Sequence, residues 1–126
     1  MNLNENETWY HGSHLLFDVL DENSTITQWK ELAEAFSHKP TMLCIDNDEQ
    51  ILHNGLQYGY LYKIDEEIKI GVDINEHPRT TMGKNMEFLT TRPLRVKLLC
   101  HVGYSDTKMV EQAEELFRKY LNSPSM

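Results

Sequence analysis

Four consecutive residues near the start of the chain combine groups that could bind a flat ligand: Tyr10, His11, Gly12 and Ser13. A glycine beside a histidine lets backbone N–H and C=O groups approach the edge of a ligand closely. The imidazole of His11 can hydrogen-bond to a hydroxyl at the same time. Together these groups suit a planar ligand that carries an amide. A second interpretation fits equally well, in which Gly12 only turns the chain after an edge strand.

A single carboxylate stands between two apolar residues much later in the chain. Glu87 follows Met86 and precedes Phe88, so in a strand its side chain projects away from both. A carboxylate among apolar neighbours is costly unless it is paired or used. If Glu87 faces a cleft, it can stabilise the positive charge that develops on a sugar carbon when a glycosidic bond breaks. The alternative is an exposed glutamate on the solvent face of a half-buried strand.

Three tyrosines alternate with other residues in the middle of the chain, at Tyr58, Tyr60 and Tyr62. This period of two predicts a strand with the three rings on one face. Such rings either pack in the core or stack on an aromatic heterocycle of a ligand.

Metal binding and cysteine chemistry are both disfavoured by the spacing of their candidate residues. The chain has six histidines and two cysteines, but no Cys-x-x-Cys or His-x-x-x-His pair, so we expect no metal site. Cys44 and Cys100 lie in apolar runs and are expected to be buried. Two cysteines are too few for a secreted disulfide framework, which favours a reduced, cytoplasmic setting. Glycine-rich phosphate loops and the serine-hydrolase elbow are also absent from the sequence.

The charge balance limits the partners. Twelve basic and 20 acidic side chains give a formal net charge of -8 at pH 7, which repels polyphosphate and argues against broad nucleic-acid binding. No run reaches the roughly 18 to 20 apolar residues that span a bilayer, so we expect no membrane segment. A small basic group either serves a phosphorylated ligand or consists of solvated charges on strand edges: Arg79, Lys84, Arg92, Arg95 and Lys97.

Hydrophobic periodicity predicts an α+β fold: a small, mixed and mainly antiparallel set of about six strands with two main helices. One domain, residues 1–126 with a core of about 8–121, is the simplest organisation. The first helix is expected from Thr27 to Pro40, opened by a capping box of Thr25 and Gln28, and the second from Ser105. The expected strands, of which the second is taken as central, are Thr8–Tyr10, Thr41–Asp46, Tyr58–Ile64, Ile68–Ile74, Glu87–Thr91 and Leu94–Val102.

Three segments, taken in order, resemble the ADP-ribosyltransferase superfamily, and most closely its small bacterial branch typified by rifampin ADP-ribosyltransferase. Residues 10–13 resemble the family's strand-borne Tyr-His-Gly-Ser/Thr motif, 60–64 its middle strand, and 91–96 the segment that leads to its last strand. The likeness covers residues 9–101. It implies a split β-sheet and NAD as a substrate, without a metal.

The resemblance also implies roles for individual residues. In the family, the histidine holds the nicotinamide ribose, the adjoining glycine backbone pairs with the carboxamide, an aromatic ring stacks on nicotinamide, and a late acid stabilises the oxocarbenium-like state. By resemblance the catalytic pair is His11 and Glu87, and the NAD-binding residues are Tyr10, Gly12, Ser13 and either Tyr60 or Tyr62. Two positions depart from the pattern. Met42–Ile45 replaces the tyrosine-bearing strand of the small branch, and Asn85 replaces the first acid or amide of the Gln/Glu-x-Glu signature.

Two functional hypotheses follow. The first is an NAD-dependent ADP-ribosyltransferase that transfers ADP-ribose to an unknown acceptor, a protein or a small molecule, and releases nicotinamide. The second keeps the fold without the chemistry, as a nucleotide-binding or protein-interaction module whose acidic surface meets a basic partner.

Overall fold

The computed structural model describes residues 3–80, 83 and 85–121. Within these ranges the chain forms two helices and nine mostly short strands, which confirms the predicted α+β class. All strand pairs are antiparallel, and they fall into three sheets, in line with the predicted split sheet. The remaining residues of the predicted 1–126 domain, including Lys84 of the basic group, lie outside the described ranges.

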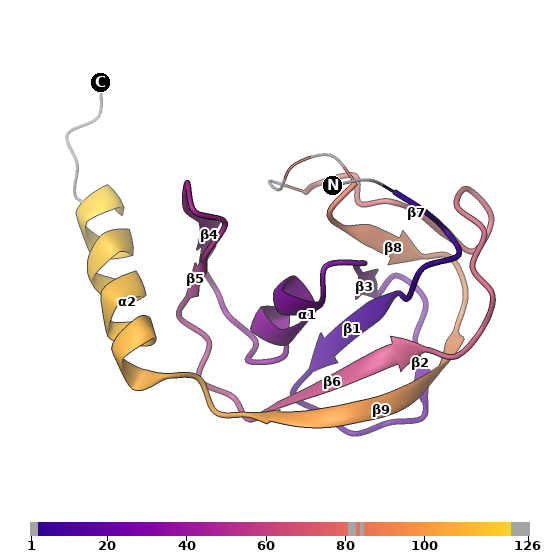
Figure 1. Ribbon diagram of the computed structural model, residues 1–126, viewed down its shortest axis with the longest axis horizontal. Coiled ribbons are helices and arrows are strands. Elements are labelled where there is room, and N and C mark those ends of the chain that lie inside the picture. Colours follow the sequence, from indigo (N-terminus) through magenta and orange to yellow (C-terminus); the bar gives the residue numbers. More distant parts are fainter. Residues whose placement is uncertain (1–2, 81–82, 84, 122–126) are drawn as a thin grey trace.

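The main sheet has four strands in the order β1-β6-β9-β2. Figure 1 shows that β9, the longest strand, curves along its whole length beside β6. In the register between β1 and β6, His11 lies opposite Tyr62 and Gly12 lies opposite Leu61. The strands are β1 (Tyr10–Ser13), β2 (Val19–Leu20), β6 (Gly59–Ile64) and β9 (Leu94–Gly103).

A smaller sheet of β3 (Thr25–Ile26), β8 (Phe88–Thr90) and β7 (Ile74–Glu76) packs against one face of the main sheet. The rings of Trp9 and Phe88 meet edge to face at 5.1 Å between the two sheets. This contact belongs to the main hydrophobic core, which is Trp9, Leu20, Ile26, Tyr62, Ile64, Ile68, Ile74, Phe88, Leu94 and Val96.

Helix α1 (Lys30–Phe36) lies against β1 at Gly12. A Cβ added to Gly12 would be 1.7 Å from the carbonyl oxygen of Ala33, so only glycine permits this approach of helix and strand. The helix starts later than predicted and has no capping box. Its N-cap residue is Trp29, which makes no side-chain cap, and the hydroxyl of Thr27 accepts a hydrogen bond from the Trp29 N–H at 3.1 Å.

Two predicted strands are wrong in placement. Strand β4 (Leu43–Ile45) is not central, because it pairs with β5 (Ile51–His53) in a two-stranded hairpin outside the main sheet. The predicted strand Ile68–Ile74 is mostly a turn, in which Gly71 has φ of 88° and the Lys69 N–H donates to the Asp73 carboxylate at 2.8 Å. Of the apolar residues in this segment, Ile68 and Ile74 are buried and Val72 is exposed.

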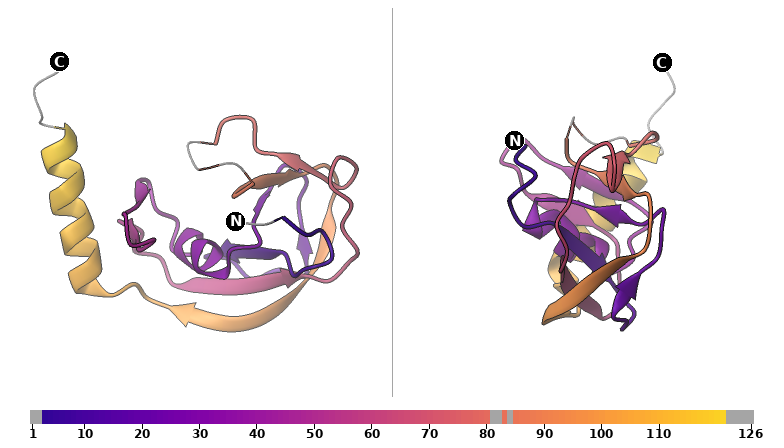
Figure 2. Two further views of the ribbon diagram at one scale, coloured as in Figure 1. Left: turned by 45° about the horizontal axis from the view of Figure 1, so that its top comes forward. Right: turned by 90° about the vertical axis from the view of Figure 1, so that its right-hand side faces the viewer.

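Helix α2 (Thr107–Leu121) stands at one end of the molecule, with the β4–β5 hairpin between it and α1 (Figures 1 and 2). It packs against β5 through a face that buries Val110, Ala113 and Phe117. Among the described residues, neither helix combines the length and the apolar character needed to cross a membrane.

Two buried histidines lie where the hairpin meets the end of α1. The rings of His38 and His53 stack at 5.3 Å with an interplanar angle of 10°. Their exposed fractions are 5% and 4%. Burial, and secondarily the nearby His38, lowers the pKa of His53 from 6.5 to about 4. His53 is therefore neutral in the folded protein at pH values where the unfolded chain takes up a proton.

We predict that replacing Gly12 with alanine destabilises the fold by several kcal/mol, because the new methyl group collides with backbone that cannot rotate away. Urea unfolding measures the change. Gly83→Ala is the matched control, since its Cβ would meet only the Met86 side chain at 3.5 Å or more. Equal stability of Gly12→Ala and wild type would contradict the tight helix contact.

We predict that His53 makes stability depend on pH. Between pH 6.5 and 4 the unfolded state binds the extra proton, so stability falls as pH is lowered through this window, by on the order of 2 to 3 kcal/mol for this group. His53→Asn keeps an acceptor for the backbone but cannot be protonated, and should remove this part of the dependence. Unfolding free energies of both proteins at pH 7 and pH 4.5 test it. Parallel pH profiles would refute the assignment.

Candidate functional site

The imidazole of His11 and the carboxylate-bearing Glu87 line one cavity, although 75 positions separate them in the chain. The cavity has a volume of about 240 Å³. Its walls come from β1, the segment around β3, the end of α1 and the residue before β8. The lining residues are His11, Gly12, Ser24, Thr25, Phe36 and Glu87.

His11 is held in one orientation by β3. Its Nδ1 lies 2.7 Å from the carbonyl oxygen of Thr25, so Nδ1 carries the proton and donates. Burial lowers the pKa of His11 below 6.5, against a smaller opposing effect of this hydrogen bond, and the ring is neutral near pH 7. Nε2 is then an acceptor, which suits a ligand hydroxyl. The rings of Phe17 and Tyr62, at 5.9 and 6.4 Å, pack beside the imidazole.

Gly12 presents backbone groups to the cavity. Tyr10 exchanges two hydrogen bonds with Thr27, of 2.7 and 3.0 Å, on the edge of β1 away from β6. Because alternate residues of a strand turn their N–H and C=O groups to the same edge, Gly12 faces the same way as Tyr10. Within the described ranges, no hydrogen bond from outside the main sheet reaches Gly12. This N–H and C=O pair can therefore serve a planar amide.

Glu87 is fixed by the preceding loop. The Thr80 hydroxyl donates to its carboxylate, and the Glu87 carbonyl oxygen accepts from the His77 N–H at 3.0 Å. Asn85, which stands where some family members have an acid or amide, has φ of 66°. Asparagine tolerates this left-handed conformation well. Asn85 therefore turns the chain just before Glu87, which is a backbone role.

The remaining predicted ligand-binding residues lie elsewhere. Tyr62 is 1% exposed, and its hydroxyl donates to Leu15 O at 2.7 Å and accepts from Phe17 N at 3.2 Å. It is a core residue that supports His11, so its assignment as a stacking residue is corrected. The ring of Tyr60 packs on His101 at 5.0 Å, outside the cavity. The hydroxyl of Ser13 accepts from Leu15 N at 3.1 Å and does not line the cavity either.

Tyr10 borders a neighbouring hollow. This hollow has a volume of about 470 Å³ and is lined by Tyr10, Trp29, Lys30 and Met86, among others. Tyr10 and Met86 directly precede His11 and Glu87 in the chain. The hollow is therefore close to the cavity, and it offers aromatic rings, one cation at Lys30 and the two carboxylates of Glu31 and Glu49.

Phe36 is the functional candidate that sequence reasoning missed. It has the helical spacing of a core residue, but it is only half-buried and supplies the aromatic wall of the cavity. Ser24 and Thr25 were also missed as lining residues. Helical spacing shows which residues share a face, but it does not show which end of that face borders a cavity.

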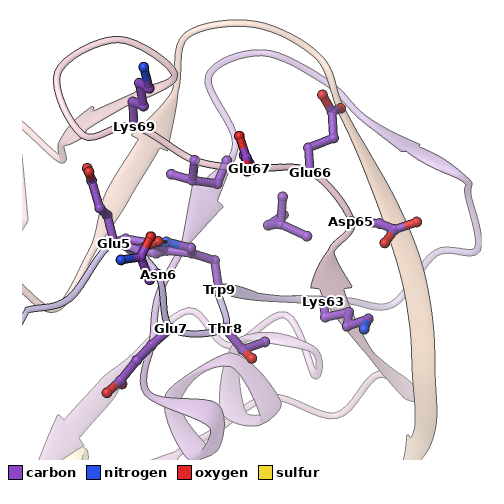
Figure 3. A pocket seen from close by; sticks show the side chains of 12 residues that line it. Glu5, Asn6, Glu7, Thr8, Trp9, Lys63, Asp65, Glu66, Glu67 and Lys69 are labelled. Carbon is purple, nitrogen blue, oxygen red and sulfur yellow. Dashed lines mark hydrogen bonds between the residues drawn. The ribbon is translucent and has the colours of Figure 1, made fainter.

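An acidic hollow of about 570 Å³ lies at the other end of β1 and β6 and has no comparable arrangement. Figure 3 shows its side chains, with the carboxylates of Glu7, Asp65 and Glu67 pointing to different sides. Glu66 is held by Arg92, whose Nη1 lies 3.0 Å from its carboxylate. This ion pair accounts for one member of the basic group as a structural residue.

Neither cysteine matches the predicted burial. Cys100 is exposed on β9 and Cys44 is half-buried in β4. The apolar run around Cys100 misled the prediction, because residues 97–101 of β9 are all exposed and therefore neither face is covered there. In the part of the chain that the structure describes, no group of three or more histidine, cysteine or acidic side chains could hold a metal ion.

Comparisons with protein-family models, with curated proteins and with solved structures each gave no match to this chain. The resemblance to ADP-ribosyltransferases therefore depends on the three sequence segments. The geometry of the cavity is a separate observation, made from the coordinates of this chain alone.

We predict that the His11 ring is protonated at Nδ1 and bare at Nε2 at pH 7, and that it titrates below pH 6.5. Nitrogen-15 NMR of the ring reports both the tautomer and the midpoint. The same chain unfolded in urea gives the reference midpoint. A bare Nδ1 would show that Thr25 does not hold the ring, and a midpoint equal to that of the unfolded chain would show that burial does not lower the pKa of His11.

Proposed function

We propose that this protein binds NAD with its nicotinamide ribose in the cavity and transfers ADP-ribose to an acceptor. The observation that carries the proposal is the shared cavity of His11, Gly12 and Glu87. A neutral imidazole acceptor, a free backbone amide edge and a carboxylate meet there, and each matches one chemical feature of a nicotinamide riboside.

The proposed binding follows from the orientation of these groups. Nε2 of His11 accepts a hydrogen bond from a ribose hydroxyl, because Nδ1 is used by Thr25. The N–H and C=O groups of Gly12 pair with the carboxamide. Phe36 offers its ring face to the pyridine ring, for which stacking is favourable.

In the proposed reaction, the bond between the ribose carbon and the nicotinamide nitrogen breaks, and its electron pair leaves with nicotinamide. Positive charge then develops on the ribose carbon. The Glu87 carboxylate stabilises that charge, which is greater in the transition state than in bound NAD. An acceptor nucleophile forms the new bond to the same carbon and loses its proton.

The cavity accommodates only part of NAD. Its volume of about 240 Å³ is below the roughly 300 to 1,000 Å³ of sites that enclose a drug-sized ligand. We place the pyrophosphate and adenosine along the neighbouring hollow, where Lys30, the one cation beside the carboxylates of Glu31 and Glu49, can meet a phosphate. The rings of Tyr10 and Trp29 can meet adenine there. NAD would then cross the edge of β1.

We predict that Glu87→Gln lowers the rate of nicotinamide release from NAD by about a hundredfold or more, while NAD still binds. Glutamine keeps an acceptor for the Thr80 hydroxyl but loses the charge. Chromatography of released nicotinamide measures the rate, and calorimetry with NAD measures binding. Glu76→Gln is the control, because Glu76 is exposed on β7 and does not line the cavity.

Three outcomes would redirect the proposal. Heat on adding NAD without nicotinamide release, across candidate acceptors, would leave a nucleotide-binding module on this fold. No heat with NAD or ADP-ribose would end the NAD proposal and leave a protein-interaction role. Full turnover in Glu87→Gln would remove Glu87 from the chemistry.

A further inference from the structure

We propose that the groove between α1, the β4–β5 hairpin and α2 binds a small organic cation with two or more amino groups. The groove has a volume of about 740 Å³. No lysine or arginine is among its lining residues within the described ranges, whereas four carboxylates line it: Glu31, Glu34, Asp48 and Glu49.

These four carboxylates are not neutralised by the protein. Among the residues that the structure describes, none of them has a lysine, arginine or histidine nitrogen within 4.0 Å. Glu31 and Glu34 come from the helix, while Asp48 and Glu49 come from the hairpin turn. Charge of one sign on two walls of a concave site attracts a ligand of the opposite sign, and a ligand with two separated amino groups can meet both walls.

Two buried histidines, His38 and His53, also line the groove, so its polar groups are not only carboxylates. Nδ1 of His38 donates to Gln57 O at 2.9 Å, and Nδ1 of His53 accepts from Gly55 N at 3.0 Å. Both side chains line the groove, and within the described ranges their hydrogen bonds are made by Nδ1 and not by Nε2. No buried side-chain nitrogen lacks a partner among these residues, so both Nε2 atoms reach solvent. Nε2 of His38 is then an acceptor for an ammonium N–H, whereas Nε2 of His53 carries a hydrogen and makes no such bond.

The apolar part of the groove favours an aliphatic chain between the amino groups. Trp29, Ile51, Leu52 and Met109 line it together with the charged residues. Methylene groups can bury against these side chains, and an ammonium group is attracted to the face of Trp29. A linear polyamine combines these features. The hollow of Figure 3 is acidic too, but Lys63 and Lys69 stand among its carboxylates and no histidine lines it.

Calorimetric titration of the full chain with spermidine, at low ionic strength and without NAD, tests the proposal. We expect saturable binding, and about tenfold weaker binding to the double variant Glu34→Gln/Glu49→Gln. The matched control is Glu7→Gln/Glu67→Gln, which removes the same charge from the hollow of Figure 3 and should leave the affinity within about twofold. Equal weakening in both double variants would mean attraction by net charge only and would overturn the site.

The histidine ring signals give a second measurement that a general charge effect would not reproduce. On adding spermidine, the signals of His38 and His53 should shift, while those of His77 and His101, which do not line the groove, stay in place. Absence of heat, or shifts without His38 and His53, would refute the proposal. Because NAD is absent from both measurements, these results are independent of NAD turnover.

Discussion

The candidate site exists because one β ladder stops after a single bridge. Tyr10 and Thr27 exchange backbone hydrogen bonds, but the next pair, Gly12 and Thr25, does not form. The Thr25 carbonyl oxygen accepts from the His11 side chain instead. This exchange leaves the Gly12 backbone edge open and fixes the imidazole beside it. The gap where the two sheets separate is therefore lined with the groups that the proposed ligand needs.

Gly12 connects this gap with the packing of α1. The two faces of β1 are used differently, because His11 turns to the core between the sheets whereas Gly12 turns to the helix. The absence of a Cβ brings the Ala33 carbonyl close to the strand. With the helix this close to β1, Phe36 at the end of α1 lines the cavity. A bulkier residue would move both the helix and the aromatic wall, so the same glycine sets the helix packing and lines the cavity.

The sequence predicted a helix or strand correctly where its hydrophobic residues recur with the period of that element. The helical spacing in α2 corresponds to one buried and one exposed face. The alternation at Tyr58–Ile64 matches strand β6, although both faces of β6 are covered, since the adjacent Leu61 and Tyr62 are both buried. The run of Leu43–Ile45 is equally apolar, but its residues are half-buried and it joins only a hairpin with β5. An apolar run predicts that its residues pack against other elements, but it does not predict which sheet or helix covers them. Ile68 and Ile74 are both buried for the same reason, although the chain turns between them.

The same reasoning explains which site residues the sequence revealed. His11 and Gly12 were found because the groups that act together are adjacent in the chain, so their spacing carries information. Phe36 and Thr25 act with them only across the fold, and no local pattern separates Phe36 from the core residues of its helix. Tyr62 is the opposite case, because the sequence pattern suggested a ligand-binding residue. The hydrogen bonds of its hydroxyl group show that it is a core residue. For an aromatic residue, the partners of its polar atoms decide between the two roles, and those partners lie 45 and 47 positions away.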